Sequence, residues 1–97
     1  MDSENVVDRR ASETAIAFGS LIRHRRKTMK MRQDQLALVT GVGRRFLIEL
    51  EGGKPSCQLG RSLLVADALG MKLADILSAG ILPAQQQLLD LPEEMDE

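Results

Sequence analysis

Aromatic side chains are scarce in this sequence. Tryptophan and tyrosine are absent, and phenylalanine occurs only twice in 97 residues. Proteins that bind single-stranded nucleic acid stack the bases on aromatic side chains, so this scarcity argues against that function. The core must therefore be aliphatic, which suits a small helical protein.

Side chains that commonly act in catalysis or bind metals, cysteine and histidine, are also few. The chain has one cysteine, Cys57, and one histidine, His24, so we expect no internal disulfide, no metal site and no cysteine nucleophile. The segment GGK at 52–54 lacks the upstream glycine and the following Ser or Thr of a phosphate-binding loop. We therefore expect neither enzyme activity nor a cofactor.

Long apolar runs are missing as well. No run approaches the roughly 18 residues of a transmembrane helix, and the first residues, MDSENVVDRR, lack the apolar region of a signal peptide. Together with the lone cysteine, this favours the reducing cytoplasm as the setting, with no membrane partner. A chain of 97 residues can bury one core, so we expect one small domain.

Residues 33–53, QDQLALVTGVGRRFLIELEGG, carry the most informative pattern. The spacing predicts two short helices, over about 33–40 and 44–51, joined by a tight turn at Gly41, where a left-handed backbone favours glycine. The apolar residues that share a face within each helix are Leu36, Ala37, Leu47 and Leu50. Such a pair of helices is typical of proteins that read DNA. The alternative is an ordinary helical hairpin inside a bundle.

Charges are segregated along the chain, although the formal net charge is only −1. Residues 15–61 carry ten lysines and arginines against three acids, and residues 80–97 carry five acids and no base. A basic body favours a polyanion through counterion release, and an acidic tail must lie away from it. A plain solvated surface explains any single arginine but not this segregation, so the pattern favours DNA as the partner.

Apolar spacing predicts three further helices. The first begins near Ser12, after a flexible segment over residues 1–11. Ser56 is the predicted N-cap of a fourth helix, which carries the apolar stripe Leu59, Leu63, Ala66 and Leu69. A short fifth helix over about 73–79 is expected to face inward through Leu73, Ile76 and Leu77.

The sequence thus predicts an all-α domain of five helices over residues 12–80, with flexible segments at both ends. Residues 81–97 are expected to form an acidic tail for dimerisation or partner binding. Ile81 and Leu82 are the expected dimer contacts, because a monomer would expose them. Leu88 and Leu89 are further candidates for a dimer or partner contact.

From about residue 18 to residue 79, the sequence resembles the Xre/Cro-type helix-turn-helix domain of phage and bacterial repressors, which has a lambda-repressor-like fold. The pattern is a Gln that opens the second helix, a Leu-Ala pair, a Gly-Val turn, an apolar residue in the third helix, and a Glu followed by Gly-Lys. In this chain the matching residues are Gln33, Leu36-Ala37, Gly41-Val42, Leu47, Glu51 and Gly53-Lys54. The resemblance implies a bacterial DNA-binding repressor.

The segments GRRFLIELEGGKPSCQLG and ADALG look like the HipB-type antitoxin branch of that family. The partners of that branch are HipA-type serine/threonine kinase toxins. This likeness implies a HipBA-like toxin–antitoxin operon that the antitoxin represses. An ordinary Xre-family repressor without a toxin partner and a protein-interaction adapter on the same fold are the alternatives.

The resemblance also implies roles for single residues. Arg44 and Arg45 would read bases in the major groove, where an arginine pairs with guanine, and Glu49 would accept a hydrogen bond from cytosine. The other expected DNA contacts, to backbone phosphates, are Gln33, Lys54, Ser56 and Arg32. Arg26 and Glu51 match positions that pair as a partly buried salt bridge between the first and third helices.

Some of these assignments have plain structural alternatives. Arg44 and Arg45 also fit as solvated residues of a first helical turn, and Gln33 as a helix-start residue. Phe46 and Ile48 depart from the usual small or polar residues of the family, so the base preference cannot be copied from a relative. One short helix reads few base pairs, so we expect a homodimer on a palindromic operator in double-stranded DNA.

Overall fold

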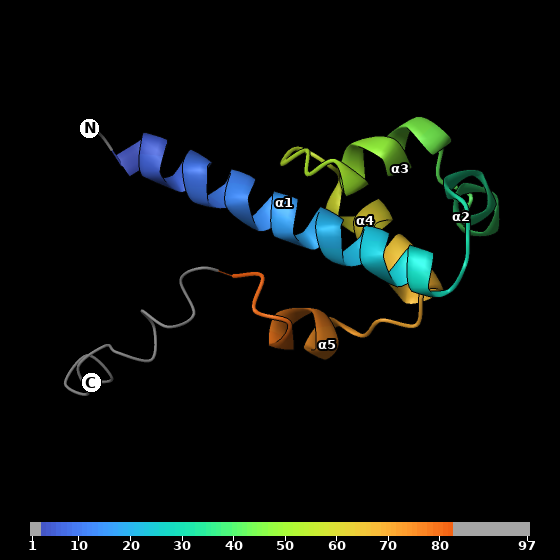
Figure 1. The fold of residues 1–97 in the computed structure, drawn as a ribbon. Helices are drawn as coiled ribbons and strands as arrows, with labels where there is room; N and C mark the ends of the chain where they lie inside the picture. The colour runs from blue at the N-terminus through green and yellow to red at the C-terminus, as the bar shows by residue number, and fades with distance from the viewer. Residues whose placement is uncertain (1–2, 83–97) are drawn as a thin grey trace.

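A computed structural model describes residues 3–82, and all regular structure within this range is helical. The five helices are α1 (Ser3–Thr28), α2 (Gln33–Thr40), α3 (Arg44–Glu51), α4 (Leu59–Ala68) and α5 (Leu73–Ser78). In Figure 1, α2 and α3 lie beside the C-terminal half of α1, and the N-terminal half of α1 extends past them. The predicted all-α domain of five helices is confirmed.

The core is small and aliphatic, as the composition predicts. Its largest fully buried side chains are Ile22, Leu36, Leu47, Val65 and Leu69. They come from α1, α2, α3 and α4 and from the residue that ends α4. Burial of such side chains stabilises each by roughly 1.5–3 kcal/mol relative to exposure. The shared core therefore packs the first four helices into one unit.

Helix α1 is longer than the sequence suggests. It begins at Ser3 rather than near Ser12, so residues 3–11 are helical where we expected a flexible segment. Neither glycine nor proline occurs between Ser3 and Phe18, so nothing in this stretch interrupts a helix that propagates towards the N-terminus. Among the helices that the structure describes, α1 included, none has both the length and the apolar character needed to cross a bilayer.

Helix α4 starts later than predicted and buries only the second half of the predicted stripe, Ala66 and Leu69. Gln58 is extended and directly precedes the helix, so Ser56 lies outside it. The buried positions around this helix are Ser62, Val65, Ala66 and Leu69, whereas Leu59 and Leu63 are exposed. Burial of Ser62 is tolerated because its hydroxyl donates a hydrogen bond of 2.7 Å to the Gln58 carbonyl oxygen.

The chain after α4 also leaves apolar side chains at the surface. In α5 only Ile76 is buried, and Leu73 and Leu77, which we expected to face inward, are exposed. Ile81 packs partly against the core, and Leu82 is exposed. The other predicted contacts, Leu88 and Leu89, lie outside the described residues.

A buried glycine sets how closely α1 approaches α3. A β-carbon at Gly19 would lie 2.3 Å from the Leu50 carbonyl oxygen and 2.9 Å from that of Glu51. Both neighbours are backbone atoms, which cannot move aside without shifting the helix. The close crossing of α1 and α3 therefore requires glycine at this position.

We predict that Gly19→Ala lowers the free energy of unfolding by about 1–3 kcal/mol, because the added methyl forces α1 away from α3. Urea denaturation followed by circular dichroism measures the change. Gly60→Ala is the matched control, since a β-carbon at Gly60 in α4 meets nothing within 4 Å. Alanine there should be neutral or slightly stabilising. Equal stability of Gly19→Ala and wild type would contradict the packing described.

Candidate nucleic-acid interface

Helices α2 and α3 form the helix–turn–helix pair that the sequence predicts. Gly41 ends α2 with φ +80°, and its N–H donates to the Ala37 carbonyl oxygen at 2.9 Å. This left-handed conformation is the reason that glycine stands at the turn. Val42 is buried in the corner between the helices, and extended Gly43 precedes α3.

The apolar faces of this pair lie where the spacing places them. Leu36 and Ala37 on α2 are buried, as are Leu47 and Leu50 on α3. Phe46 packs partly against the same core, so one of the residues that depart from the family pattern braces α3 from within. Arg44, Arg45 and Ile48 of α3 are exposed.

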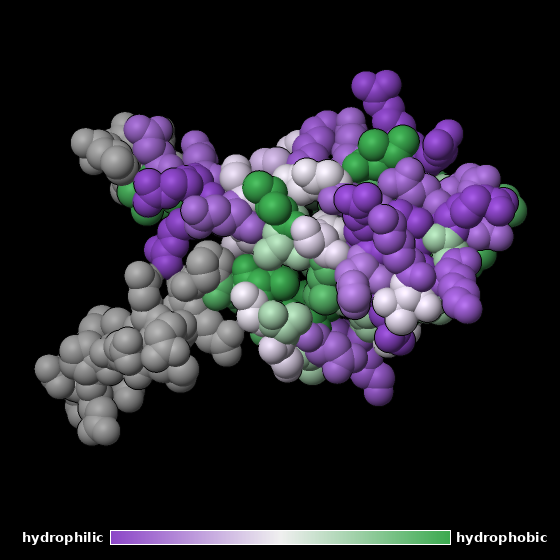
Figure 2. Space-filling view, viewed as in Figure 1, coloured by the Kyte–Doolittle hydropathy of each residue, from purple (hydrophilic) through white to green (hydrophobic). Residues whose placement is uncertain are grey.

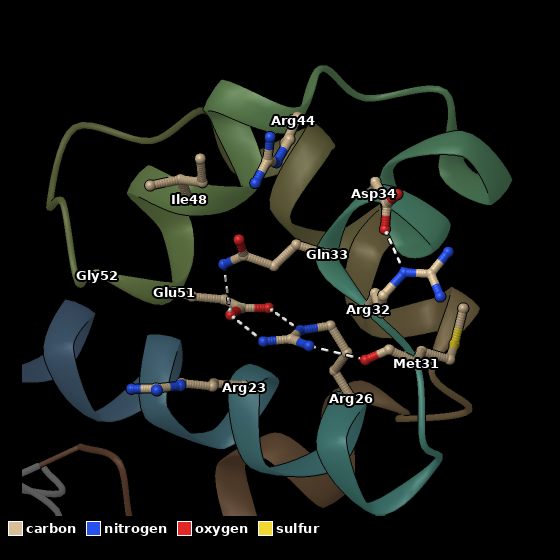
Figure 3. Close-up of a pocket in the computed structure, with 10 residues that line it drawn as sticks. All are labelled: Arg23, Arg26, Met31, Arg32, Gln33, Asp34, Arg44, Ile48, Glu51 and Gly52. Atoms are coloured by element: carbon tan, nitrogen blue, oxygen red, sulfur yellow. Dashed lines mark hydrogen bonds and ion pairs between the residues drawn. The ribbon is translucent and has the colours of Figure 1, made fainter.

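A buried polar network ties this pair to α1. The Arg26 guanidinium donates two hydrogen bonds to the Glu51 carboxylate, at 2.7 and 2.9 Å, and a third to the Met31 carbonyl oxygen at 2.8 Å. The side chains of Arg26 and Glu51 are only 8% and 3% exposed. The hydrogen bond with Glu51 raises the pKa of Arg26 above its ordinary value. Figure 3 shows the network between α1 and α3.

Gln33 joins this network instead of pointing to solvent. Its side-chain Nε2 donates to Glu51 Oε1 at 3.1 Å (Figure 3). The amide is therefore already engaged within the protein at the start of α2, where we expected it to contact a phosphate. The position at the helix N-terminus remains suited to an anion, because the first N–H groups of a helix have no carbonyl partner within it.

Cationic side chains from α1, from α3 and from the residue that precedes α2 surround an open groove beside the network. This polar groove has a volume of about 620 Å³ and is lined by Arg23, Arg32, Gln33, Arg44 and Ile48 among others. Figure 3 shows that Arg23 comes from α1, Arg32 from the start of α2 and Arg44 from α3. Arg32 also pairs with Asp34 at 3.2 Å, which lowers the pKa of that carboxyl.

Arg23 was not among the residues predicted to form the site. Its position could have been inferred from the sequence, because Arg23 precedes Arg26 by three residues and residues three apart share one side of a helix. Once Arg26 is paired inward with Glu51, its neighbour Arg23 must lie at the edge of the same surface. The structure places it, exposed, in the wall of the polar groove.

A second group of charged side chains, Arg45, Glu49 and Lys54, was also predicted to contact DNA. Glu49 is bracketed by two cations, with Arg45 Nε 3.6 Å from Oε2 and Lys54 Nζ 3.3 Å from Oε1. Arg45 is nevertheless 91% exposed at its side chain, and Arg44 beside it is also exposed. Ser56 is exposed in the loop between α3 and α4. The first turn of α3 therefore presents two guanidinium groups outward.

Within residues 3–82, no group of three or more His, Cys, Asp and Glu side chains gathers in a way that could hold a metal ion.

A short helix ended by a left-handed glycine and a second helix with a cationic outer turn define a helix-turn-helix unit. Over 68 residues the chain is 47% identical to y4mF of Sinorhizobium fredii (strain NBRC 101917 / NGR234), an uncharacterized HTH-type transcriptional regulator. The similarity covers 70% of this chain and 88% of that protein. The chain belongs to the family of HTH-type transcriptional regulators. No protein-family model and no solved structure matches it.

We predict that Arg26→Ala lowers the free energy of unfolding by about 3–5 kcal/mol, because it leaves the Glu51 carboxylate buried without its cation. Arg23→Ala is the matched control on the same helix. Arg23 is exposed, so its loss should change stability by less than about 0.5 kcal/mol.

Urea denaturation of both variants measures the difference. Should Arg26→Ala fail to fold, the double variant Arg26→Met with Glu51→Leu tests the same point. Removal of both charges should restore a folded protein. Equal stabilities of Arg26→Ala and Arg23→Ala would show that the pair does not hold α3 in place.

Proposed function

We propose that this protein is a sequence-specific transcriptional repressor that inserts α3 into the major groove of double-stranded DNA. The observation that carries the proposal is the outward presentation of Arg44 and Arg45 on the first turn of a helix whose opposite face is buried. An arginine in the major groove donates to both O6 and N7 of guanine, a pairing that distinguishes guanine from the other bases.

Other polar and charged residues support this docking. Lys54, Ser56 and Arg32 are exposed around α3 and the start of α2, where they would contact phosphates and set the register of the protein on DNA. Glu49 would orient Arg45 until DNA is bound and then accept from the N4 amino group of a cytosine. Gln33 would contact a phosphate after it exchanges its bond with Glu51 for one to the DNA backbone.

We further propose that two copies bind a palindromic operator. A single unit of this size reads few base pairs, and two recognition helices one DNA turn apart read two half-sites. The partly buried Ile81 and the exposed Leu82 after α5 are the proposed contacts between the copies. The aliphatic character of these two side chains supports an apolar seam.

The likeness to the HipB-type branch supports a finer proposal. In it, the protein is the antitoxin of a HipBA-like operon, represses that operon and neutralises a HipA-like kinase toxin. Co-expression with the product of the neighbouring gene, followed by co-purification, tests this part. A kinase-like product that forms no complex would leave an ordinary Xre-family repressor as the function.

We predict that Arg45→Ala lowers operator affinity by about 1–3 kcal/mol and relaxes base preference, with a similar loss for Arg44→Ala. A mobility-shift titration at two salt concentrations, against the DNA upstream of the protein's own gene, measures the change. Arg61→Ala is the matched control, because it removes the same charge from an exposed position on α4.

The same titration separates the repressor from a protein-interaction adapter on this fold. An adapter would tolerate loss of Arg44 and Arg45 as well as it tolerates loss of Arg61. Affinity that is equal for all DNA sequences would reduce the interaction to non-specific electrostatics. Either result would contradict the proposed function.

A further inference from the structure

An apolar groove lies beside the residues assigned to DNA and shares Lys54 with them. It has a volume of about 580 Å³ and runs between the N-terminal half of α1 and helices α4 and α5. Its apolar lining includes Val7, Phe18, Leu59, Leu63, Leu73 and Leu77. Figure 2 shows apolar surface gathered between α1 and α5.

The aliphatic side chains of this groove are solvent-exposed. Leu59 is 72% exposed, Leu73 58% and Leu77 43%. A continuous apolar surface of this kind in a small protein marks a place where another segment packs. Of the residues predicted to face inward on α4 and α5, Ala66, Leu69 and Ile76 are buried, whereas the four leucines line the groove instead of the core.

The charged side chains that line the groove are basic, and one of them, Lys54, pairs with Glu49 at 3.3 Å. Arg10 and Lys54 are its charged lining residues, and neither aspartate nor glutamate belongs to the lining that the structure describes. An occupant with leucines for the groove and carboxylates for its edge would complement both features. Such a segment follows directly in the sequence.

The chain leaves the described region inside the groove. Ile81 and Leu82, the last described residues, both line it, and fifteen residues follow. These residues, PAQQQLLDLPEEMDE, contain three leucines and five acids and carry no lysine or arginine. Their composition matches the apolar lining and the basic edge.

The length of this segment is sufficient. The α1 wall from Val7 to Phe18 is about 17 Å long at 1.5 Å per residue. Residues 83–91 reach roughly 30 Å when extended. Leu88, Leu89 and Leu91 are therefore within reach of the whole groove from their attachment at Leu82.

We propose that residues 83–97 dock into this groove of their own chain, with Leu88, Leu89 and Leu91 against its leucines and the acids near Arg10 and Lys54. Leu88 and Leu89 then belong to an intramolecular contact in place of the dimer or toxin contact expected from the sequence. Because Lys54 is also a proposed phosphate contact, the docked segment brings negative charge next to the DNA-binding surface. The proposal does not depend on the DNA-binding function.

The single cysteine provides the test. Cys57 lines the groove and is half-buried, so the rate at which a maleimide modifies it reports whether the groove is covered. Burial raises the pKa of the Cys57 thiol, so all rates are compared at one pH. The full chain is used throughout, and circular dichroism verifies that each variant is folded.

Wild type is compared with the triple variant Leu88→Ser, Leu89→Ser and Leu91→Ser. The matched control is Gln85→Ser, Gln86→Ser and Gln87→Ser, which changes neighbouring residues without removing apolar surface. The leucine variant should react roughly tenfold faster, the factor for a segment that covers the groove about nine-tenths of the time. The glutamine variant should react like wild type.

The rate is also measured over a range of protein concentrations. A same-chain contact protects Cys57 equally at every concentration, whereas a second copy protects it more as concentration rises. Protection that grows with concentration in wild type but not in the leucine variant would place the tail leucines in the groove of a second copy and overturn the proposal. Equal rates for wild type and the leucine variant would overturn it as well.

Discussion

The ion pair between Arg26 and Glu51 determines how the helix-turn-helix unit is held. It joins the end of α1 to the end of α3 in a site from which water is almost excluded. Two further groups complete it, the Met31 carbonyl oxygen before α2 and the Gln33 amide at its start. A buried pair adds little net stability, but loss of one partner is costly. Its main effect is therefore to restrict α1, α2 and α3 to one arrangement.

That restriction acts together with the close helix crossing at Gly19. The absence of a β-carbon there lets the backbone of α1 approach the carbonyl groups at the end of α3. Because Leu47 and Leu50 bury one face of α3, the side chains of Arg44 and Arg45 are left at the surface. The exposure of Arg44 and Arg45 is thus a consequence of packing on the opposite side of the helix.

Helix α1 separates two surfaces of different chemistry. Its C-terminal half contributes Arg23 to the polar groove near α2 and α3. Its N-terminal half contributes Val7 and Phe18 to the apolar groove near α4 and α5. Lys54 lies in the loop after α3, pairs with Glu49 on that helix and also lines the apolar groove. The charge of a segment bound in the apolar groove would therefore act on Lys54, which is one of the proposed DNA contacts.

The α2–turn–α3 unit was predictable because its signals are local. The left-handed turn favours glycine at position 41, and helical spacing alone places Leu36 and Leu47 inward. The face of α4 was not predictable in this way, because leucines and small residues form two competing stripes along it. Burial of Ser62 depends on a hydrogen bond within its own helix, which spacing does not reveal. Likewise, Gln33 turns towards Glu51 only because α3 brings that carboxylate within reach.

We propose that guanidinium groups of α3 read guanine in duplex DNA. The affinity for operators in which single guanines are replaced by 7-deazaguanine, which lacks the N7 acceptor, tests this contact atom by atom. At the contacted guanines, the replacement should weaken binding of wild type but not of the variant that lacks the contacting arginine. Wild-type affinity that is unchanged by replacement of every guanine would contradict the account.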